Sequence, residues 1–180
     1  MIHDIKEYVT YLDGVHKRTM QYVKVIPNEL LDWKPSENKF STGDLLRHIA
    51  SSRLMFLGVF EHGNWTYSGH DSSKGATIED ISNYLNECQN KLSEGLLRVG
   101  NDVLTKKVST LHGHEVSAWR ILMAMPEHEI HHRVITAIRM YHFCHLFYQP
   151  LPRDLPLEAN VFTNGRISRN CFYTSKVLER

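Results

Sequence analysis

Apolar residues recur at three- and four-residue steps along four stretches of the chain, a pattern typical of amphipathic helices. The first stretch covers about residues 2–26 and ends before a proline. The second begins at Ser41 and the third covers residues 77–99; each opens with a hydroxyl that can cap the helix and an acidic residue in the first turn. The fourth covers about residues 117–147, and Pro126 within it predicts a kink.

Four such helices predict an all-α domain, an antiparallel four-helix bundle over about residues 1–150. Residues 103–116 are short and partly β-branched, and we expect a loop or a small hairpin there. Three prolines between positions 150 and 156 rule out a continuing helix, and Asn164-Gly165 is typical of a hairpin turn. We therefore expect residues 151–180 to form a short irregular or hairpin C-terminal extension of unknown role.

The composition limits the classes of partner. The chain has 180 residues, a formal net charge of +1 and no basic cluster, which suits a soluble domain and argues against nucleic acid or an acidic membrane as partners. No apolar stretch approaches the ~20 residues of a membrane span. Three widely spaced cysteines, Cys88, Cys144 and Cys171, predict a reducing, cytoplasmic setting rather than a disulfide framework.

Twelve histidines are the unusual feature of the composition, and three of them are spaced as metal ligands. His128 and His132 are four residues apart, so on a helix they lie about 40° apart around the axis and about 6 Å apart along it. Two imidazoles in this arrangement can bind one ion. His48 lies in the apolar stripe of the second helix. The pattern predicts a metal site formed by His48, His128 and His132.

Two other interpretations of these histidines stay open. Residues 128–132 also read His-Glu-x-x-His, the zincin protease pattern, with Glu129 as the general base. The metzincin extension of that pattern needs a glycine and a histidine where this chain has Ile135 and Ile138, and little chain remains downstream for a third protease ligand. The histidines could also be ordinary surface or core residues that bind no ion.

Several segments resemble, in order, those of the DinB-like (DNA-damage-inducible) family of four-helix bundles. They are Trp33-Lys34-Pro35, residues 40–48, residues 112–117 and His128-Glu129-Ile130-His131-His132-Arg133. The resemblance covers about residues 1–150. It implies that His48, His128 and His132 hold a divalent ion, zinc or nickel, and that the protein is a homodimer. Family members usually continue with Arg-Gly-Gln, where this chain has Arg133-Val134-Ile135.

An ion held by three histidines keeps a free position, as in catalytic sites. Such an ion activates a water for hydrolysis or a thiol for transfer. The resemblance implies either chemistry on a small molecule, a thiol S-transferase with a low-molecular-weight thiol as co-substrate or a hydrolase. A non-catalytic metal-binding module for stress response or dimerisation is the alternative. Direct DNA binding is a weaker hypothesis, because the charge is near neutral.

Two further residues are weak catalytic candidates. Glu129 lies about 100° around the helix from His128, so a role at the surface or beside the ligands competes with a role as base. Arg133 could pair with a substrate anion or with Glu129, or be a solvated charge.

Overall fold

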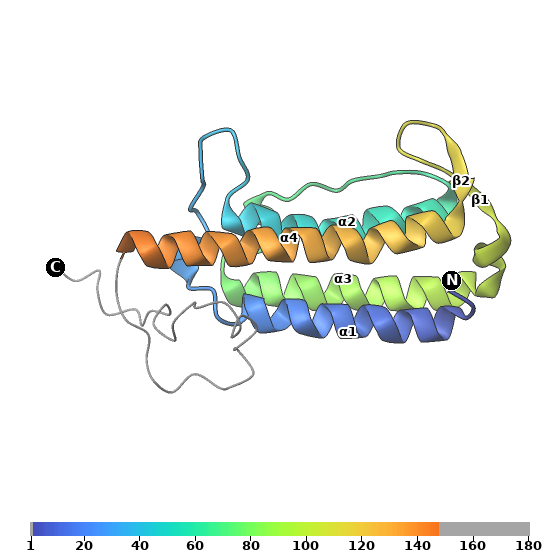
Figure 1. The fold of residues 1–180 in the computed structure, drawn as a ribbon, viewed down its shortest axis with the longest axis horizontal. Coiled ribbons are helices and arrows are strands. Elements are labelled where there is room, and N and C mark those ends of the chain that lie inside the picture. Colours follow the sequence, from blue (N-terminus) through green and yellow to red (C-terminus); the bar gives the residue numbers. More distant parts are fainter. Residues whose placement is uncertain (1, 148–180) are drawn as a thin grey trace.

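The computed structural model describes residues 2–147 of the chain, apart from the side chains of residues 144–147. Four helices run the length of the molecule side by side (Figure 1). They are α1 (Ile5–Val23), α2 (Thr42–His62), α3 (Ile78–Val99) and α4 (Ala118–Phe147). The expected antiparallel four-helix bundle is confirmed. The predicted C-terminal extension, residues 151–180, lies outside the described residues.

Side-chain caps set where three of the helices begin. The Asp4 carboxylate accepts from the backbone N–H of Lys6, so α1 begins later than the apolar pattern predicts. Ser41 and Asp44 form a reciprocal capping box at the start of α2, and Thr77 and Asp80 form one at the start of α3. These caps are local features, which is why the sequence predicts the starts of α2 and α3 well.

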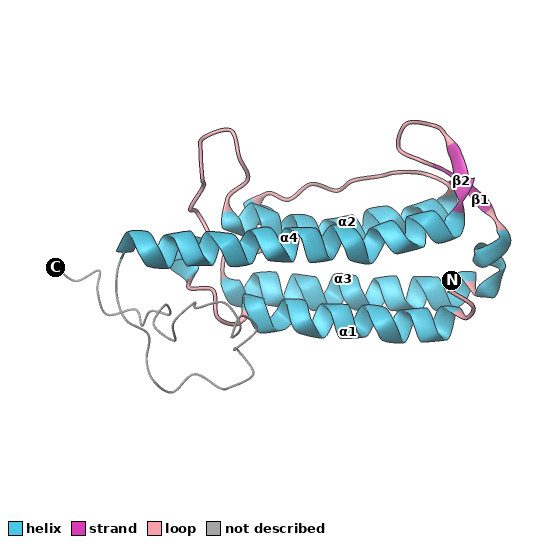
Figure 2. Cartoon of the chain, viewed as in Figure 1, coloured by secondary structure: helices cyan, strands magenta, loops and turns pink. Residues whose placement is uncertain are grey.

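Short elements fill the connections between the helices (Figure 2). Single 3₁₀ turns occur at Asn28–Leu30, Ser72–Lys74 and Asn101–Thr105. A two-stranded antiparallel hairpin, β1 (Lys107–Ser109) and β2 (Glu115–Ser117), precedes α4. A loop or a small hairpin was expected for this segment, and the hairpin is confirmed.

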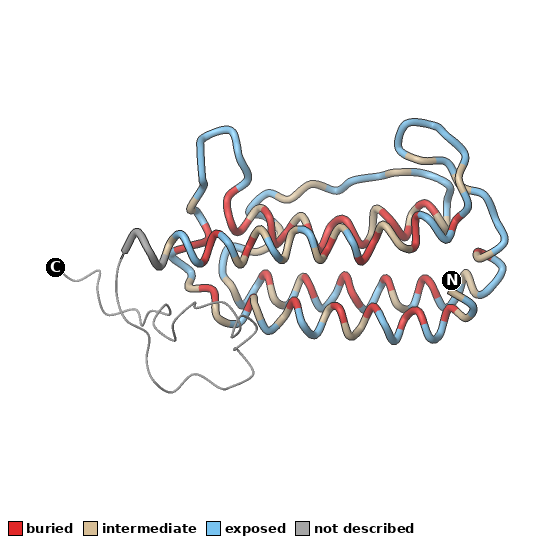
Figure 3. The backbone as a smooth tube through the Cα atoms, viewed as in Figure 1, coloured by how far each residue is buried: buried red, intermediate tan, exposed pale blue. Residues whose placement is uncertain are grey.

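Buried residues recur along all four helices (Figure 3). The apolar ones among them form two clusters. One joins the start of α1 to the end of α2, with Leu12 and Phe56 among its members, and the other contains Ile49 and Leu85. Buried polar residues, including Arg53, lie between these positions on the helices. The bundle thus has a polar layer near its middle.

Pro126 lies inside α4, where it cannot donate a hydrogen bond to the carbonyl of Leu122. The hydroxyl of Tyr8, on α1, donates to that carbonyl instead. Tyr8 is 4% exposed, and burial, the first cause, raises the pKa of its hydroxyl, so the group stays a donor at neutral pH. The proline therefore creates an acceptor that ties α4 to α1.

We predict that Tyr8→Phe lowers the free energy of unfolding by about 1–3 kcal/mol, because it leaves the Leu122 carbonyl buried without a donor. Urea unfolding followed by circular dichroism measures this change. Tyr11→Phe, at a tyrosine that is 45% exposed, is the matched control and should change little. Equal stability of the two variants would contradict the role given to Tyr8.

Candidate metal centre

Three imidazole nitrogens converge between α2 and α4. The Nε2 atom of His128 lies 3.1 Å from Nε2 of His48 and 3.0 Å from Nε2 of His132. The three ligand atoms all lie within 4.8 Å of one another. The structure therefore brings together the three histidines that the sequence predicts as ligands, and each of them is half-buried.

Hydrogen bonding alone cannot account for this arrangement. An imidazole nitrogen carries either one proton or one lone pair, so it makes one conventional hydrogen bond in its ring plane. Nε2 of His128 faces two other nitrogens at 3.1 Å and 3.0 Å. A cation between the three lone pairs satisfies all of them, and metal–nitrogen bonds of about 2.0–2.1 Å fit such separations. The donor set fits a divalent ion.

The histidines are held in the neutral form that binds metal. Burial and the neighbouring His128 and His70 lower the pKa of His48 to about 4. Burial, then the other histidines and Arg139, lower the pKa of His132 to about 3. The pKa of His128 is also lowered, first by burial. Their lone pairs are thus free at neutral pH.

A tyrosine from the loop after α2 orients His48. The Tyr67 hydroxyl lies 2.7 Å from Nδ1 of His48 and 2.9 Å from Nδ1 of His70. With Nε2 of His48 facing the other ligands, its Nδ1–H donates to Tyr67, whose hydroxyl then donates to His70. The ring of Phe40 packs over His70, with 4.1 Å between the ring centroids. No sequence pattern pointed to Tyr67 or His70, which lie in a Gly- and Ser-rich loop.

This loop is fastened to α2 through its backbone carbonyls. Arg47 Nε donates to the carbonyl of His70 at 2.8 Å, and its Nη1 donates to that of Gly75 at 2.7 Å. The Ser51 hydroxyl donates to the carbonyl of Gly69 at 2.5 Å. The loop thus holds His70, and through it Tyr67, close to the ligand set.

Glu129 points into the core, away from the surface. Its side chain accepts two hydrogen bonds from Arg53, from Nε at 3.0 Å and from Nη2 at 2.8 Å, and one from Thr19 at 2.6 Å. Burial raises the pKa of Glu129, but Arg53 and the hydrogen bonds outweigh burial, so the net pKa is lowered. Both oxygens of this ionised carboxylate are occupied.

The ion pair belongs to a network that reaches all four helices. Arg53 on α2 also donates to the carbonyl of Leu85 on α3 at 2.8 Å, and its Nη2 lies 3.1 Å from Nδ1 of His16 on α1. The opposite ring nitrogen of His16 lies 2.8 Å from the side-chain oxygen of Asn86. Glu129 adjoins His128 in the chain, so this network fixes the rotation of α4 at the ligands.

Arg133 does not contact Glu129. Its Nη1 donates to the Val15 carbonyl at 3.4 Å, and its guanidinium lies 5.8 Å from the Tyr22 ring centroid. Arg133 therefore packs against α1. His112, His114, His131 and His142 are exposed.

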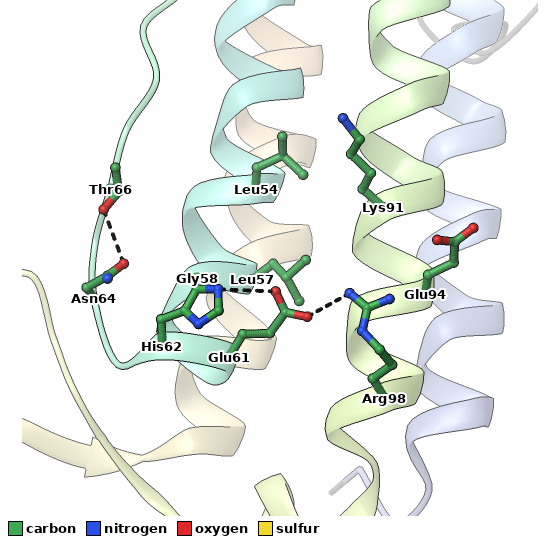
Figure 4. Close-up of a pocket in the computed structure, with 10 residues that line it drawn as sticks. All are labelled: Leu54, Leu57, Gly58, Glu61, His62, Asn64, Thr66, Lys91, Glu94 and Arg98. Atoms are coloured by element: carbon green, nitrogen blue, oxygen red, sulfur yellow. Dashed lines mark hydrogen bonds and ion pairs between the residues drawn. The ribbon is translucent and has the colours of Figure 1, made fainter.

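A separate groove of about 470 Å³ lies between the end of α2 and α3 (Figure 4). Its wall includes Glu61, which accepts from Arg98 at 2.8 Å and lies 3.9 Å from His62. The groove contains none of the three converging histidines. Its charged groups compensate one another, and we assign it no role.

Residues 1–139 match the DinB family. The chain belongs to the DinB family. No curated protein matches the sequence significantly. Within residues 2–147, none of the helices has the length and apolar character needed to cross a membrane.

Solved structures share the fold of this DinB-family chain. A DinB-like protein from Bacillus cereus is 17% identical, with a TM-score of 0.66 over 79% of this chain and 94% of the other. A DinB-like protein from Bacillus subtilis is 23% identical, with a TM-score of 0.59 over 73% and 87%. A mycothiol-dependent maleylpyruvate isomerase is 13% identical, with a TM-score of 0.59 over 72% and 59%.

We predict that Arg53→Met lowers the free energy of unfolding by about 3–5 kcal/mol, because it leaves the Glu129 carboxylate buried and unpaired. The double variant Arg53→Met/Glu129→Leu should recover most of that loss, and urea unfolding measures both. Lys91→Met removes the exposed Lys91–Glu87 pair and should have little effect. A double variant as unstable as the single one would show that the pair is not coupled.

We also predict that Tyr67→Phe weakens divalent-metal binding about 10- to 100-fold, because His48 loses the acceptor that orients its ring. Competition with a chromogenic chelator measures the affinity. Tyr84→Phe is the control, since the Tyr84 hydroxyl lies 3.0 Å from that of Ser51, which donates to the same loop, and Ser51 is not one of the three histidines. If both variants lose affinity equally, the effect comes from the loop and not from His48.

Proposed function

We propose that this chain is a metal-dependent thiol S-transferase acting on a small molecule. His48, His128 and His132 hold a divalent ion, zinc or nickel. The convergence of the three Nε2 atoms, with His128 3.0–3.1 Å from the other two, is the observation that carries the proposal. An ion with three protein ligands keeps a free position, where it lowers the pKa of a bound thiol or water.

The hydrogen bonds of the nearby carboxylates favour a thiol, rather than water, as the group that the ion activates. Hydrolysis by the zincin route needs a free carboxylate to take a proton from water. Glu129, the candidate for that role, is bound to Arg53 and Thr19. Asp44, one turn before His48, is held by Arg47 and by the backbone N–H of Ser41. A thiol has a pKa near 8.5, so it needs no such base once a cation stabilises the thiolate.

The thiol dependence in the name of one structural neighbour, the mycothiol-dependent isomerase, agrees with this choice. In the transfer that we propose, the thiol sulfur forms a bond to an electrophilic carbon of the second substrate. The bond from that carbon to its leaving group breaks, and the leaving group departs with the electron pair. The thiol proton passes to solvent. The three histidines hold the ion, and the rings of Phe40 and Tyr67 pack against the ring of His48.

Metal analysis tests the ligand set. We expect near-stoichiometric divalent metal in the wild-type protein and a loss of it in His48→Ala, His128→Ala and His132→Ala. His112→Ala, at an exposed hairpin position, is the control and should keep its metal. Undiminished metal in the His48 variant would reject the three-ligand site, since two histidines on one helix would then suffice.

Thiol transfer is tested with the cobalt-loaded protein. We expect 2-mercaptoethanol to produce a sulfur-to-cobalt charge-transfer band, and the zinc- or nickel-loaded protein to accelerate its reaction with 1-chloro-2,4-dinitrobenzene, releasing chloride. His132→Ala should abolish both signals. Metal without thiol binding would contradict the transferase and leave hydrolysis or a non-catalytic metal-binding module.

A further inference from the structure

Arg139, near the end of α4, is a buried charge that makes no ion pair or hydrogen bond through Nε or Nη1 within residues 2–147. Its side chain is buried, with 7% of the residue exposed to solvent. Arg53 shows the usual solution for a buried arginine, since it is bound to a carboxylate and a carbonyl. Arg139 has neither.

An unpaired buried guanidinium destabilises a fold, because burial removes its hydration without replacing it. The nearby carboxylate of Asp44 compensates for this loss only in part: burial lowers the pKa of Arg139 more than the charge of Asp44 raises it. The carboxylate already accepts from Arg47 at 2.8 Å and from the Ser41 N–H at 2.9 Å. Two guanidinium nitrogens are therefore buried without an acceptor among the described residues.

The position of Arg139 connects it to the metal centre. It follows His132 by seven residues, which places both on the same face of α4 about 10 Å apart along the axis. Helical side chains lean toward the N-terminus of their helix, so that of Arg139 leans back toward His132. The Nδ1 atom of His132 is also buried without a partner in the described region. Unsatisfied polar atoms thus gather along this face.

We propose that Arg139 binds a carboxylate of the small molecule whose reactive end lies at His48, His128 and His132. The inference rests on the proposed function and adds the substrate class, an organic acid. One guanidinium balances one negative charge, which favours a carboxylate over a phosphate dianion. Arg133, the arginine that the sequence proposed for a substrate anion, already contacts α1.

The test compares acidic and neutral thiols of the same size. Mercaptoacetate, 3-mercaptopropionate and 4-mercaptobutanoate are each titrated into the cobalt-loaded full-length protein beside the corresponding amide, with the charge-transfer band as readout. We expect at least one acid to bind about 10-fold or more tightly than its amide, as a charge-assisted hydrogen bond provides. Arg139→Met should remove that preference and leave amide binding unchanged, whereas Arg133→Met should keep it.

The outcomes separate the two proposals. Equal binding of acids and amides in the wild-type protein would overturn the role of Arg139 and leave the transferase standing. Failure of every thiol to bind would overturn both. A second measurement needs no metal: thermal unfolding of metal-free Arg139→Met should show an unchanged or higher Tm than wild type. A Tm lower by several degrees would mean that Arg139 stabilises the fold itself, and would overturn the inference.

Discussion

The ion pair between Arg53 and Glu129 is the constraint on which the centre of this bundle depends. It lies between two apolar clusters and contacts all four helices. Glu129 follows His128 directly, and adjacent residues of a helix point about 100° apart around its axis. When the Glu129 carboxylate faces Arg53 in the core, His128 therefore faces His48 on α2. The same pair anchors α2 five residues beyond His48. One core interaction thus aligns both helices that supply the histidines, and it explains a His-Glu-x-x-His sequence whose glutamate is not free to act as a base.

Two buried arginines of this chain, Arg53 and Arg139, differ in what compensates their charge. Arg53 is 3% exposed and Arg139 is 7% exposed, so both have lost nearly all their water. Arg53 has a carboxylate, a carbonyl and an imidazole around it. Nε and Nη1 of Arg139 have no partner within residues 2–147. Because an uncompensated buried charge is costly, a fold keeps one only where something else compensates it. A ligand that carries the opposite charge is the compensation that we infer for Arg139.

The sequence predicted what depends on local patterns. Apolar periodicity located the four helices, Ser41 and Thr77 marked two starts, and the four-residue spacing of His128 and His132 placed both on one face. It did not reveal Arg53 as the partner of Glu129, 76 positions away, because nothing near either residue encodes that contact. The contact between Tyr67 and His48 could not be predicted either, because no local pattern encodes it.

The three converging histidines therefore differ in what holds them. His128 and His132 share one helix, whose rotation is set by the buried ion pair beside them. His48 comes from another helix, and its ring orientation depends on Tyr67, in a loop held by side chains of α2 and covered partly by Phe40. A change in the loop would alter His48 while leaving the α4 pair in place. The α4 pair therefore depends on the core of the bundle, whereas His48 depends on a surface loop that can change independently of the core.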